Sequence, residues 1–250
     1  MGARSKPVMA AFALYLLWSM ATWLLEGRID TFARPDAVAD RLIYTGVANM
    51  LIGLVGAGLV IRYVGAWREG GGRNAPSPLW IGIGLALGLG LYFGQGAPSA
   101  DPVVLLNAYA QVFVVSAAEV MVCWGVVSGS LRRAIGGPAW LAAIGAAVIG
   151  SLLFGLYHFA HSAPFNQPGM VAFLSVIGLL TAGFYLASGD IYATIAFHNF
   201  LGVYGVVQAL SASGGIAAFR SLQVPLILTA LAALALLAAV DVLLLRRTRA

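Results

Sequence analysis

Apolar residues form long, nearly uninterrupted runs along this chain, and polar residues gather in the short segments between them. A run of about 20 apolar residues is long enough to cross a bilayer as a helix. Because lipid offers the main chain no hydrogen-bond partners, and no alternating strand pattern is present, the runs predict an all-α fold. We expect a polytopic membrane helix bundle with about eight transmembrane helices. The runs lie at about 8–26, 43–64, 79–95, 103–131, 139–162, 169–187, 191–210 and 222–245.

The polar segments between the runs are short. Residues 28–41 mix charged and apolar side chains, which is typical of a short helix lying at the membrane interface. The Gly-rich tract 68–78 predicts a flexible loop. The run that begins at Pro7 is long and has no clear small-residue cleavage site, so we interpret it as the first span. No repeat or low-complexity linker divides the chain, and residues 1–250 are expected to form a single integral-membrane domain.

Composition supports the membrane setting and excludes other classes. The chain is 61% hydrophobic and 9% charged, whereas a soluble domain needs far more charged surface. Its 14 basic residues exceed its 9 acidic ones, but they lie at helix ends and in short loops. That placement favours contact with membrane lipid and predicts no nucleic-acid partner.

The basic residues also predict an orientation. An even number of spans puts both termini on one side, and a cytoplasmic N-terminus places ten of the 14 basic residues inside. We therefore expect a multi-pass protein of the cell (inner) membrane with both termini cytoplasmic. The ten residues are Arg4, Lys6, Arg62, Arg68, Arg73, Arg132, Arg133, Arg246, Arg247 and Arg249.

Glutamate and histidine side chains inside apolar runs are the candidates for chemistry. We single out Glu119 and the three histidines of the chain, His158, His161 and His198. A carboxylate in mid-helix must be neutral or held by a polar partner, and either state suits a general base. The alternative is a hydrogen bond to a neighbouring helix that only aids packing.

Spacing refines the histidine assignments. His158 and His161 are three residues apart and could reach the same cavity, with Phe154 one turn before His158 and packing against it. A metal pair is possible, although the H-E-x-x-H arrangement typical of zinc is missing. His161 is the candidate for a structural, interfacial histidine. His198 and Asn199 are adjacent and point about 100° apart, so only a wide cavity could use both.

The order of these residues resembles the CPBP family of intramembrane proteases, which includes the CaaX-processing endoprotease and bacterial bacteriocin-processing or immunity proteins. The family pattern is E-E-x-x-x-R-G, then F-x-x-x-H, then H-x-x-x-N or its Asp variant. The matching positions are Glu119 with Gly125, Phe154 with His158, and His198. The resemblance covers about residues 103–210, the expected protease-like core, and the number of spans agrees over the whole chain.

The resemblance implies roles for these residues. Glu119 would activate water, and His158 and His198 would bind the oxyanion or polarise the scissile carbonyl. Asn199, His161 and Phe154 are possible supporting residues.

Three positions depart from the family pattern. Val120 stands at the second glutamate, Trp124 at the arginine, and Gly202 at the final Asn or Asp. The supporting ion pair is therefore absent as a whole, which leaves no single unpaired charge. Asn199 could substitute for the residue missing at position 202, but it lies on a different face of the helix.

The leading hypothesis is a peptidase of the CPBP type, acting on a peptide or membrane-protein substrate in a membrane cavity. The glutamate-water mechanism requires no cofactor, and a divalent metal remains an open possibility. One alternative is a catalytically inactive relative that acts as a binding or scaffold protein, which the three departures favour. The other is a small proton-linked transporter that uses the same groups as a relay.

Two further observations bear on the mechanism. Cys123, the single cysteine, lies one turn after Glu119, which suggests a thiolate nucleophile, but buried cysteines usually behave as small hydrophobic residues. Helical rise places Glu119 about 18 Å from the Arg132 end of its span and His198 about 12 Å from Asp190. The same rise places His158 about 30 Å from Pro138, so its depth matches only if its helix is tilted or starts outside the hydrocarbon.

Overall fold

The structure is a computed structural model that describes residues 5–30, 38–64 and 77–245. These residues are predominantly helical and contain no strand, which confirms the predicted all-α polytopic bundle. The predicted Gly-rich loop lies almost wholly outside the described residues, as does half of the predicted interfacial helix, residues 31–37; residues 28–30 form a turn. The described end of that segment, from Val38, already belongs to the helix of the second span.

The helical elements follow the apolar runs. In chain order they are α1 (Ser5–Thr22), η1 (Trp23–Gly27), α2 (Val38–Tyr44), η2 (Thr45–Gly56), α3 (Ala57–Val64), α4 (Pro78–Gly94), α5 (Pro102–Glu119), η3 (Val120–Ser128), α6 (Gly129–Ala134), α7 (Ala139–Tyr157), η4 (His158–Ala160), α8 (Pro168–Ser188), α9 (Ile191–Ala212), α10 (Ile216–Phe219), α11 (Val224–Val240) and η5 (Asp241–Leu245). Here η4 is a 3-10 turn and the other η elements are π-helical.

Seven of the described helices are long and apolar enough to cross a membrane. They coincide with seven of the eight predicted runs. The run at 79–95 forms α4, which has 17 residues and is the shorter exception. A helix of that length rises about 25 Å, slightly less than the roughly 30 Å of a hydrocarbon core.

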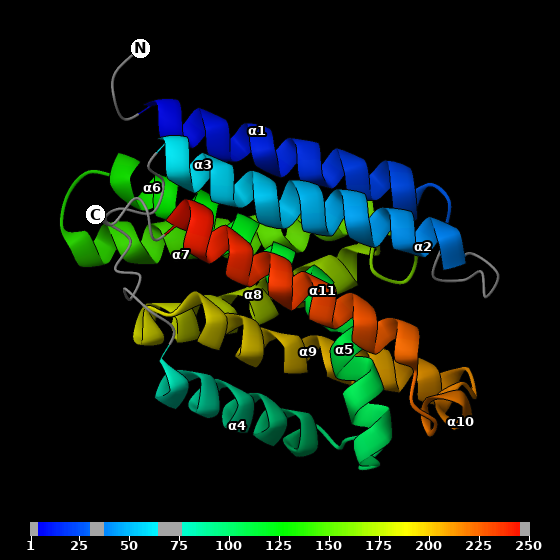
Figure 1. Ribbon diagram of the computed structural model, residues 1–250. Helices are drawn as coiled ribbons and strands as arrows, with labels where there is room; N and C mark the ends of the chain where they lie inside the picture. Colours follow the sequence, from blue (N-terminus) through cyan, green and yellow to red (C-terminus); the bar gives the residue numbers. More distant parts are fainter. Residues whose placement is uncertain (1–4, 31–37, 65–76, 246–250) are drawn as a thin grey trace.

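The span from Pro102 to Ala134 lies at the centre of the bundle. Its apolar window is 83% buried inside the protein, far more than that of the other spans. In Figure 1, α1 and α3 lie along one side of the bundle and α4 lies along the opposite side, beside α9. Further packing joins α5 to α9 and α7 to α8. A carboxylate on the central span is therefore surrounded by protein.

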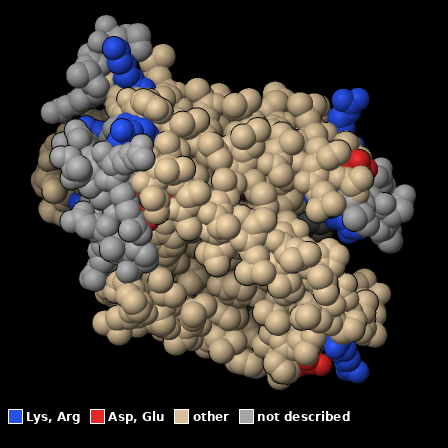
Figure 2. Space-filling model, viewed as in Figure 1, with Lys and Arg blue, Asp and Glu red and all other residues tan. Residues whose placement is uncertain are grey.

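On the face shown in Figure 2, charged side chains lie at the two ends of the bundle. Figure 2 shows the Lys, Arg, Asp and Glu side chains of this face at both ends, separated by a broad band without charge. Large exposed apolar side chains such as Leu16, Leu87, Leu152 and Leu228 contribute to the apolar surface. A surface of this kind suits lipid, because hydrocarbon solvates apolar side chains and leaves charge at the interfaces.

Helix caps fix where two of the site-bearing helices begin. The Asp101 carboxylate accepts hydrogen bonds from the Val103 and Val104 main-chain N–H groups at the start of α5. The Asp190 carboxylate does the same at the start of α9, directly after Gly189, which adopts a left-handed conformation with φ 60°. Such caps satisfy main-chain donors that a helix start leaves unpaired. They set the register that carries Glu119 and His198 to one place.

Candidate active site

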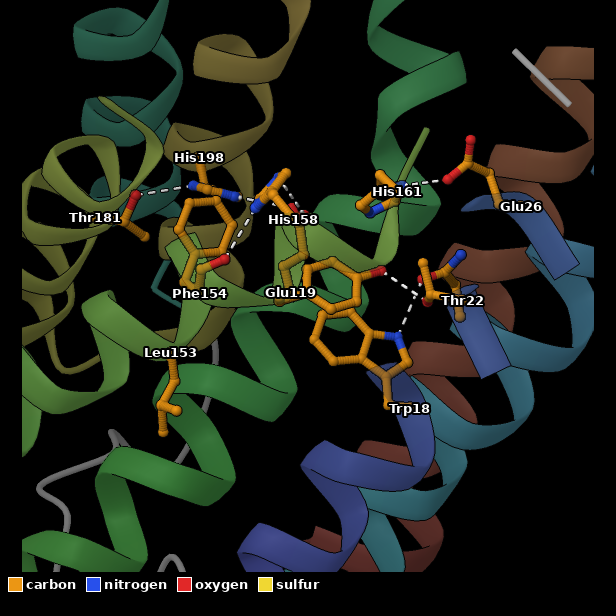
Figure 3. Close-up of polar contacts among 12 residues, drawn as sticks. Trp18, Thr22, Glu26, Glu119, Leu153, Phe154, His158, His161, Thr181 and His198 are labelled. Atoms are coloured by element: carbon orange, nitrogen blue, oxygen red, sulfur yellow. Dashed lines mark hydrogen bonds and ion pairs between the residues drawn. The ribbon is translucent and has the colours of Figure 1, made fainter. Parts of the chain in front are cut away.

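Three buried side chains meet in the interior of the bundle: Glu119, His158 and His198. Glu119 Oε2 lies 3.1 Å from His198 Nε2, and Glu119 Oε1 lies 3.6 Å from His158 Nε2. The exposed fractions of the three residues are 5%, 7% and 3%. The structure thus brings together one acid and two imidazoles that are up to 79 residues apart in the chain. Figure 3 shows both rings turned toward the carboxylate.

Glu119 occupies the junction between two kinds of helix. It is the last residue of α5, and the π-helical segment η3 begins at Val120. π-Helical turns are rare and occur often at functional sites, because the wider turn redirects side chains. The Ser128 hydroxyl supports this segment: its Oγ lies 3.0 Å from the main-chain carbonyl oxygens of both Cys123 and Ala146, the latter on α7, and its one proton is shared between them.

His158 lies where α7 ends. The helix stops at Tyr157, and His158 begins the 3-10 turn η4. Its Nδ1 lies 2.9 Å from the Phe154 carbonyl oxygen, which only accepts, so Nδ1 carries the hydrogen. The Phe154 ring packs against it as predicted, with ring centroids 4.8 Å apart. The contact with Glu119 shows that His158 reaches the same level as Glu119, a point the helix lengths alone left open.

A threonine that the sequence did not single out orients His198. Thr181 on α8 places its Oγ1 2.8 Å from His198 Nδ1 and 3.1 Å from the Ile177 carbonyl oxygen. The carbonyl can only accept, so the Thr181 hydroxyl donates to it and accepts from His198 Nδ1–H. A threonine within an apolar span gives no distinctive sequence signal. Only the packing of α8 against α9 reveals its partner.

These contacts determine how protons are arranged around Glu119. Both histidines hold a hydrogen on Nδ1. When a ring is neutral, its Nε2 atom therefore carries a lone pair and can only accept a hydrogen bond. A hydrogen bond of 3.1 Å between His198 Nε2 and a carboxylate oxygen requires one proton between them. That proton gives either a neutral acid beside a neutral imidazole or a carboxylate beside an imidazolium. The pair carries no net charge in both forms, which suits a buried site in a membrane protein.

His161 lies close to this site but points to a different partner. It follows the 3-10 turn in extended conformation and so is not on a helix with His158, although the run 139–162 predicts one helix through both residues. The chain turns away because η4 ends at Ala160. The His161 Nδ1 atom lies 2.8 Å from Glu26 Oε2 at the end of the first span. It is 5% exposed, and so is a buried histidine with a partner.

Glu26 is a buried carboxylate that the sequence analysis missed. It is 0% exposed and also accepts hydrogen bonds from the Ser162 main-chain N–H and hydroxyl groups. The available signal was its place at the end of a long apolar run, which resembles an ordinary helix end at the interface. Sequence distance hid the partner, since His161 lies 135 residues away.

Asn199 does not join the Glu119 cluster. Its side-chain N–H donates to the Tyr109 carbonyl on α5 at 3.0 Å, and so it links α9 to α5. This agrees with the expectation that it lies on a different face from His198.

The residues that depart from the family pattern pack against neighbouring helices. Val120 and Trp124 are both 0% exposed. The Trp124 ring lies 5.2 Å from that of Phe154 and 5.4 Å from that of His198, measured between centroids, and forms an apolar wall beside the imidazole. A Cβ atom at Gly202 would lie 2.5 Å from Val112 Cγ1. The close approach of α9 to α5 therefore leaves no space for the Asn or Asp side chain of the family pattern.

The structure also bears on the thiolate nucleophile and on a metal site. Cys123 is fully buried, one turn beyond Glu119, in the hydrophobic core. Within residues 5–30, 38–64 and 77–245, no group of three or more His, Cys, Asp or Glu side chains is arranged as a metal site.

Comparison with known families bears on the central part of the chain. Residues 101–204 match the family described as type II CAAX prenyl endopeptidase Rce1-like. These residues are similar to that family, and we call them the Rce1-like segment. The match confirms the resemblance to the CPBP proteases, and its bounds are close to the predicted core of 103–210. No curated protein and no solved structure gives a match.

The Rce1-like segment contains the whole cluster of Glu119, His158 and His198, together with Thr181 and Trp124. It excludes α1, η1, α2, η2, α3, α4 and α11, most of which pack against it. Glu26, the partner of His161, lies outside the matched residues. At the family level, the match supports a CAAX-type endopeptidase that is embedded in a membrane.

Proposed function

We propose that this protein is an intramembrane endopeptidase in which Glu119 activates a water molecule to hydrolyse a peptide bond. The observation that carries the proposal is the placement of the Glu119 carboxyl between the Nε2 atoms of His158 and His198. The Rce1-like match over the same residues supports it. A general base must lie within hydrogen-bond reach of the proton it takes, directly or through one water.

The distances suggest where the water would bind. The 3.6 Å between Glu119 Oε1 and His158 Nε2 exceeds a normal hydrogen bond, yet both atoms can contact one water that lies beside them. The shorter contact to His198 carries the shared proton. In its ionised form this pair supplies a carboxylate base and an imidazolium donor in the same site, which is the combination that peptide hydrolysis requires.

The reaction then proceeds in two steps. The water oxygen attacks the scissile carbonyl carbon while a water proton passes to Glu119, and the carbonyl oxygen becomes an oxyanion that accepts a hydrogen bond from His198 Nε2–H. The carbon–nitrogen bond then breaks, and the departing nitrogen takes the proton from Glu119. Because Gly202 has no side chain and Asn199 is bound to Tyr109, oxyanion stabilisation falls to His198, while the Nε2 lone pair of His158 can accept from the attacking water.

The family match and the apolar surface support a substrate class and a location. A prenylated CaaX-type tail would enter from lipid, where its apolar chain is solvated, and bring its peptide bond to the buried cluster. We also propose that residues 1–250 act as one membrane domain of the cell (inner) membrane, with both termini cytoplasmic. The basic residues Lys6, Arg62, Arg132 and Arg133 lie at the bundle end where α1 begins and α6 ends, as the positive-inside rule requires.

Cleavage of a farnesylated, fluorogenic CaaX peptide by the purified protein in lipid nanodiscs tests the proposal. Glu119→Gln removes the base while keeping size and is expected to lower kcat by at least about 100-fold, with unchanged thermal unfolding. His198→Ala is expected to lower kcat by about 100-fold as well, because it removes the oxyanion donor. Gly205→Ala, where an added Cβ meets no atom within 4 Å, is the matched control and should behave as wild type.

Two results would contradict the proposal. Wild type that binds the peptide without cleaving it would identify a binding or scaffold protein that retains the pocket. Cleavage that survives Glu119→Gln unchanged would assign the reaction to other residues.

A further inference from the structure

We propose that Glu26 is a positioning residue: its carboxylate holds the turn 158–162 against the N-terminal span and thereby fixes the direction in which His158 faces Glu119. The inference extends the proposed function, because it places part of the catalytic apparatus outside the Rce1-like segment. It rests on geometry that is independent of the reaction itself.

His158 requires an external support because its own helix has ended. α7 stops at Tyr157, and the chain leaves the 3-10 turn at His161 in extended conformation. A ring on the last turn of a helix has fewer main-chain constraints than one in mid-helix, since helix ends lack hydrogen-bond partners. The Phe154 carbonyl fixes one ring nitrogen of His158. The path of the turn decides where the other nitrogen points.

Glu26 contacts this turn through several hydrogen bonds. His161 Nδ1 lies 2.8 Å from Glu26 Oε2, and the Ser162 main-chain nitrogen lies 3.1 Å from the same oxygen. The Ser162 hydroxyl donates to Glu26 Oε1. A fully buried carboxyl group with three hydrogen-bond partners is held firmly, because a buried polar group left unpaired costs about 1–3 kcal/mol.

The connection from Glu26 to His158 is short. The His161 main-chain N–H donates to the His158 carbonyl at 3.1 Å, so a shift of His161 moves the backbone that carries His158. The two imidazole rings are 5.4 Å apart between centroids. Figure 3 shows Glu26 and His161 paired on one side of His158, with His198 on the other.

Packing around Glu26 indicates that the two segments are fitted to each other. A Cβ added to Gly27 would collide with the Ala160 carbonyl oxygen, so only glycine allows the first span to approach the turn this closely. One turn before Glu26, Thr22 Oγ1 lies 3.0 Å from Tyr157 OH. The Trp18 ring stacks on the Tyr157 ring at 3.6 Å between centroids. The first span therefore contacts the end of α7 both before and after His158.

The variants follow from these contacts. Glu26→Ala removes all three hydrogen bonds to His161 and Ser162, whereas Glu26→Gln keeps an oxygen that can accept from the Ser162 donors. Asp30→Asn is the matched control: Asp30 is an exposed carboxylate four residues later, and asparagine tolerates its left-handed φ of 53°. Gly27→Ala displaces the turn while leaving the carboxylate in place, and Gly46→Ala, with no atom within 4 Å of an added Cβ, is its control.

Two readouts are measured in lipid nanodiscs. The first is kcat and KM for the farnesylated peptide. The second is the NMR spectrum of protein labelled with 15N at histidine. It contains signals from only three residues and needs no substrate. Glu26→Ala and Gly27→Ala are expected to lower kcat about 10- to 100-fold with KM within about twofold, because small misplacements of a catalytic group have effects of that size. The signals of His158 and His161 should shift together, while those of His198 remain.

The proposal is overturned if Glu26→Ala leaves kcat within about twofold of wild type, or if only the His161 signals move. Should Glu26→Ala fail to fold, Glu26→Gln and Gly27→Ala decide the question by the same two readouts. If wild type cleaves no peptide, the proposed function fails, and the histidine spectrum still decides whether Glu26 orients His158.

Discussion

The Thr181 hydroxyl lies 2.8 Å from His198 Nδ1 and thereby determines which nitrogen of that ring faces Glu119. The threonine donates to the Ile177 carbonyl, so it must accept from the imidazole. Outer hydrogen bonds of this kind fix the tautomer and orientation of a functional histidine, and their loss lowers activity. A residue without a direct contact to Glu119 is thus expected to affect the reaction.

Thr181→Val tests that expectation. Valine has nearly the same shape but no hydroxyl, so His198 loses its Nδ1 partner. We expect kcat to fall about 10- to 100-fold with little change in KM. Thr181→Ser restores the hydroxyl and should recover most of the activity. Equal rates for wild type and Thr181→Val would show that the ring needs no such support.

Gly202→Ala should destabilise the protein. Its Cβ would lie 2.5 Å from Val112 Cγ1, where α9 crosses α5, and overpacking of this kind costs about 1–3 kcal/mol. The free energy of unfolding in mild detergent measures the effect. Gly205→Ala on the same helix has open space and should be neutral. Adding Val112→Ala to Gly202→Ala should recover part of the loss, and the absence of recovery would contradict this explanation.

The paired departure at positions 120 and 124 predicts a coupled effect. Trp124→Arg alone places an unpaired charge at a fully buried position, which is expected to destabilise the fold by about 3–5 kcal/mol. Val120→Glu with Trp124→Arg restores the family's ion pair and should be less damaging than the sum of the two single changes. A double-mutant cycle in thermal unfolding measures the coupling. Additive effects would show that the two positions do not interact.

Cys123→Ala separates a glutamate mechanism from a thiolate mechanism. Cys123 is fully buried in the hydrophobic core, so its replacement removes a small apolar group. Peptide cleavage should stay within about threefold of wild type, whereas loss of a nucleophile lowers kcat by several orders of magnitude. Peptide cleavage by wild type should also be unaffected by a membrane-permeant thiol reagent, which is a second measurement of the same point.

The fold and the main candidates could be predicted because their signals are local. Apolar runs near 20 residues specify helices wherever lipid is the solvent, and seven of the eight expected spans have full length. Titratable groups are rare in such runs, so Glu119, His158 and His198 could each be recognised as candidates from the local sequence. The run predicted at 79–95 forms α4 with the expected length of 17 residues, and it ends at Gly94 before a turn that leads to the Asp101 cap of α5.

The sequence alone determined that the chain forms membrane helices, which acid and imidazole groups lie within them, and which family pattern the central segment resembles. Tertiary structure decided which of these groups meet. His161 turned to Glu26, Asn199 turned to Tyr109, and Thr181 reached His198. The physical reason is that periodicity fixes which face of a helix a residue occupies, whereas its partner depends on how neighbouring helices pack and where each one ends. Those relations join residues up to 135 positions apart, and no local pattern in the chain encodes them.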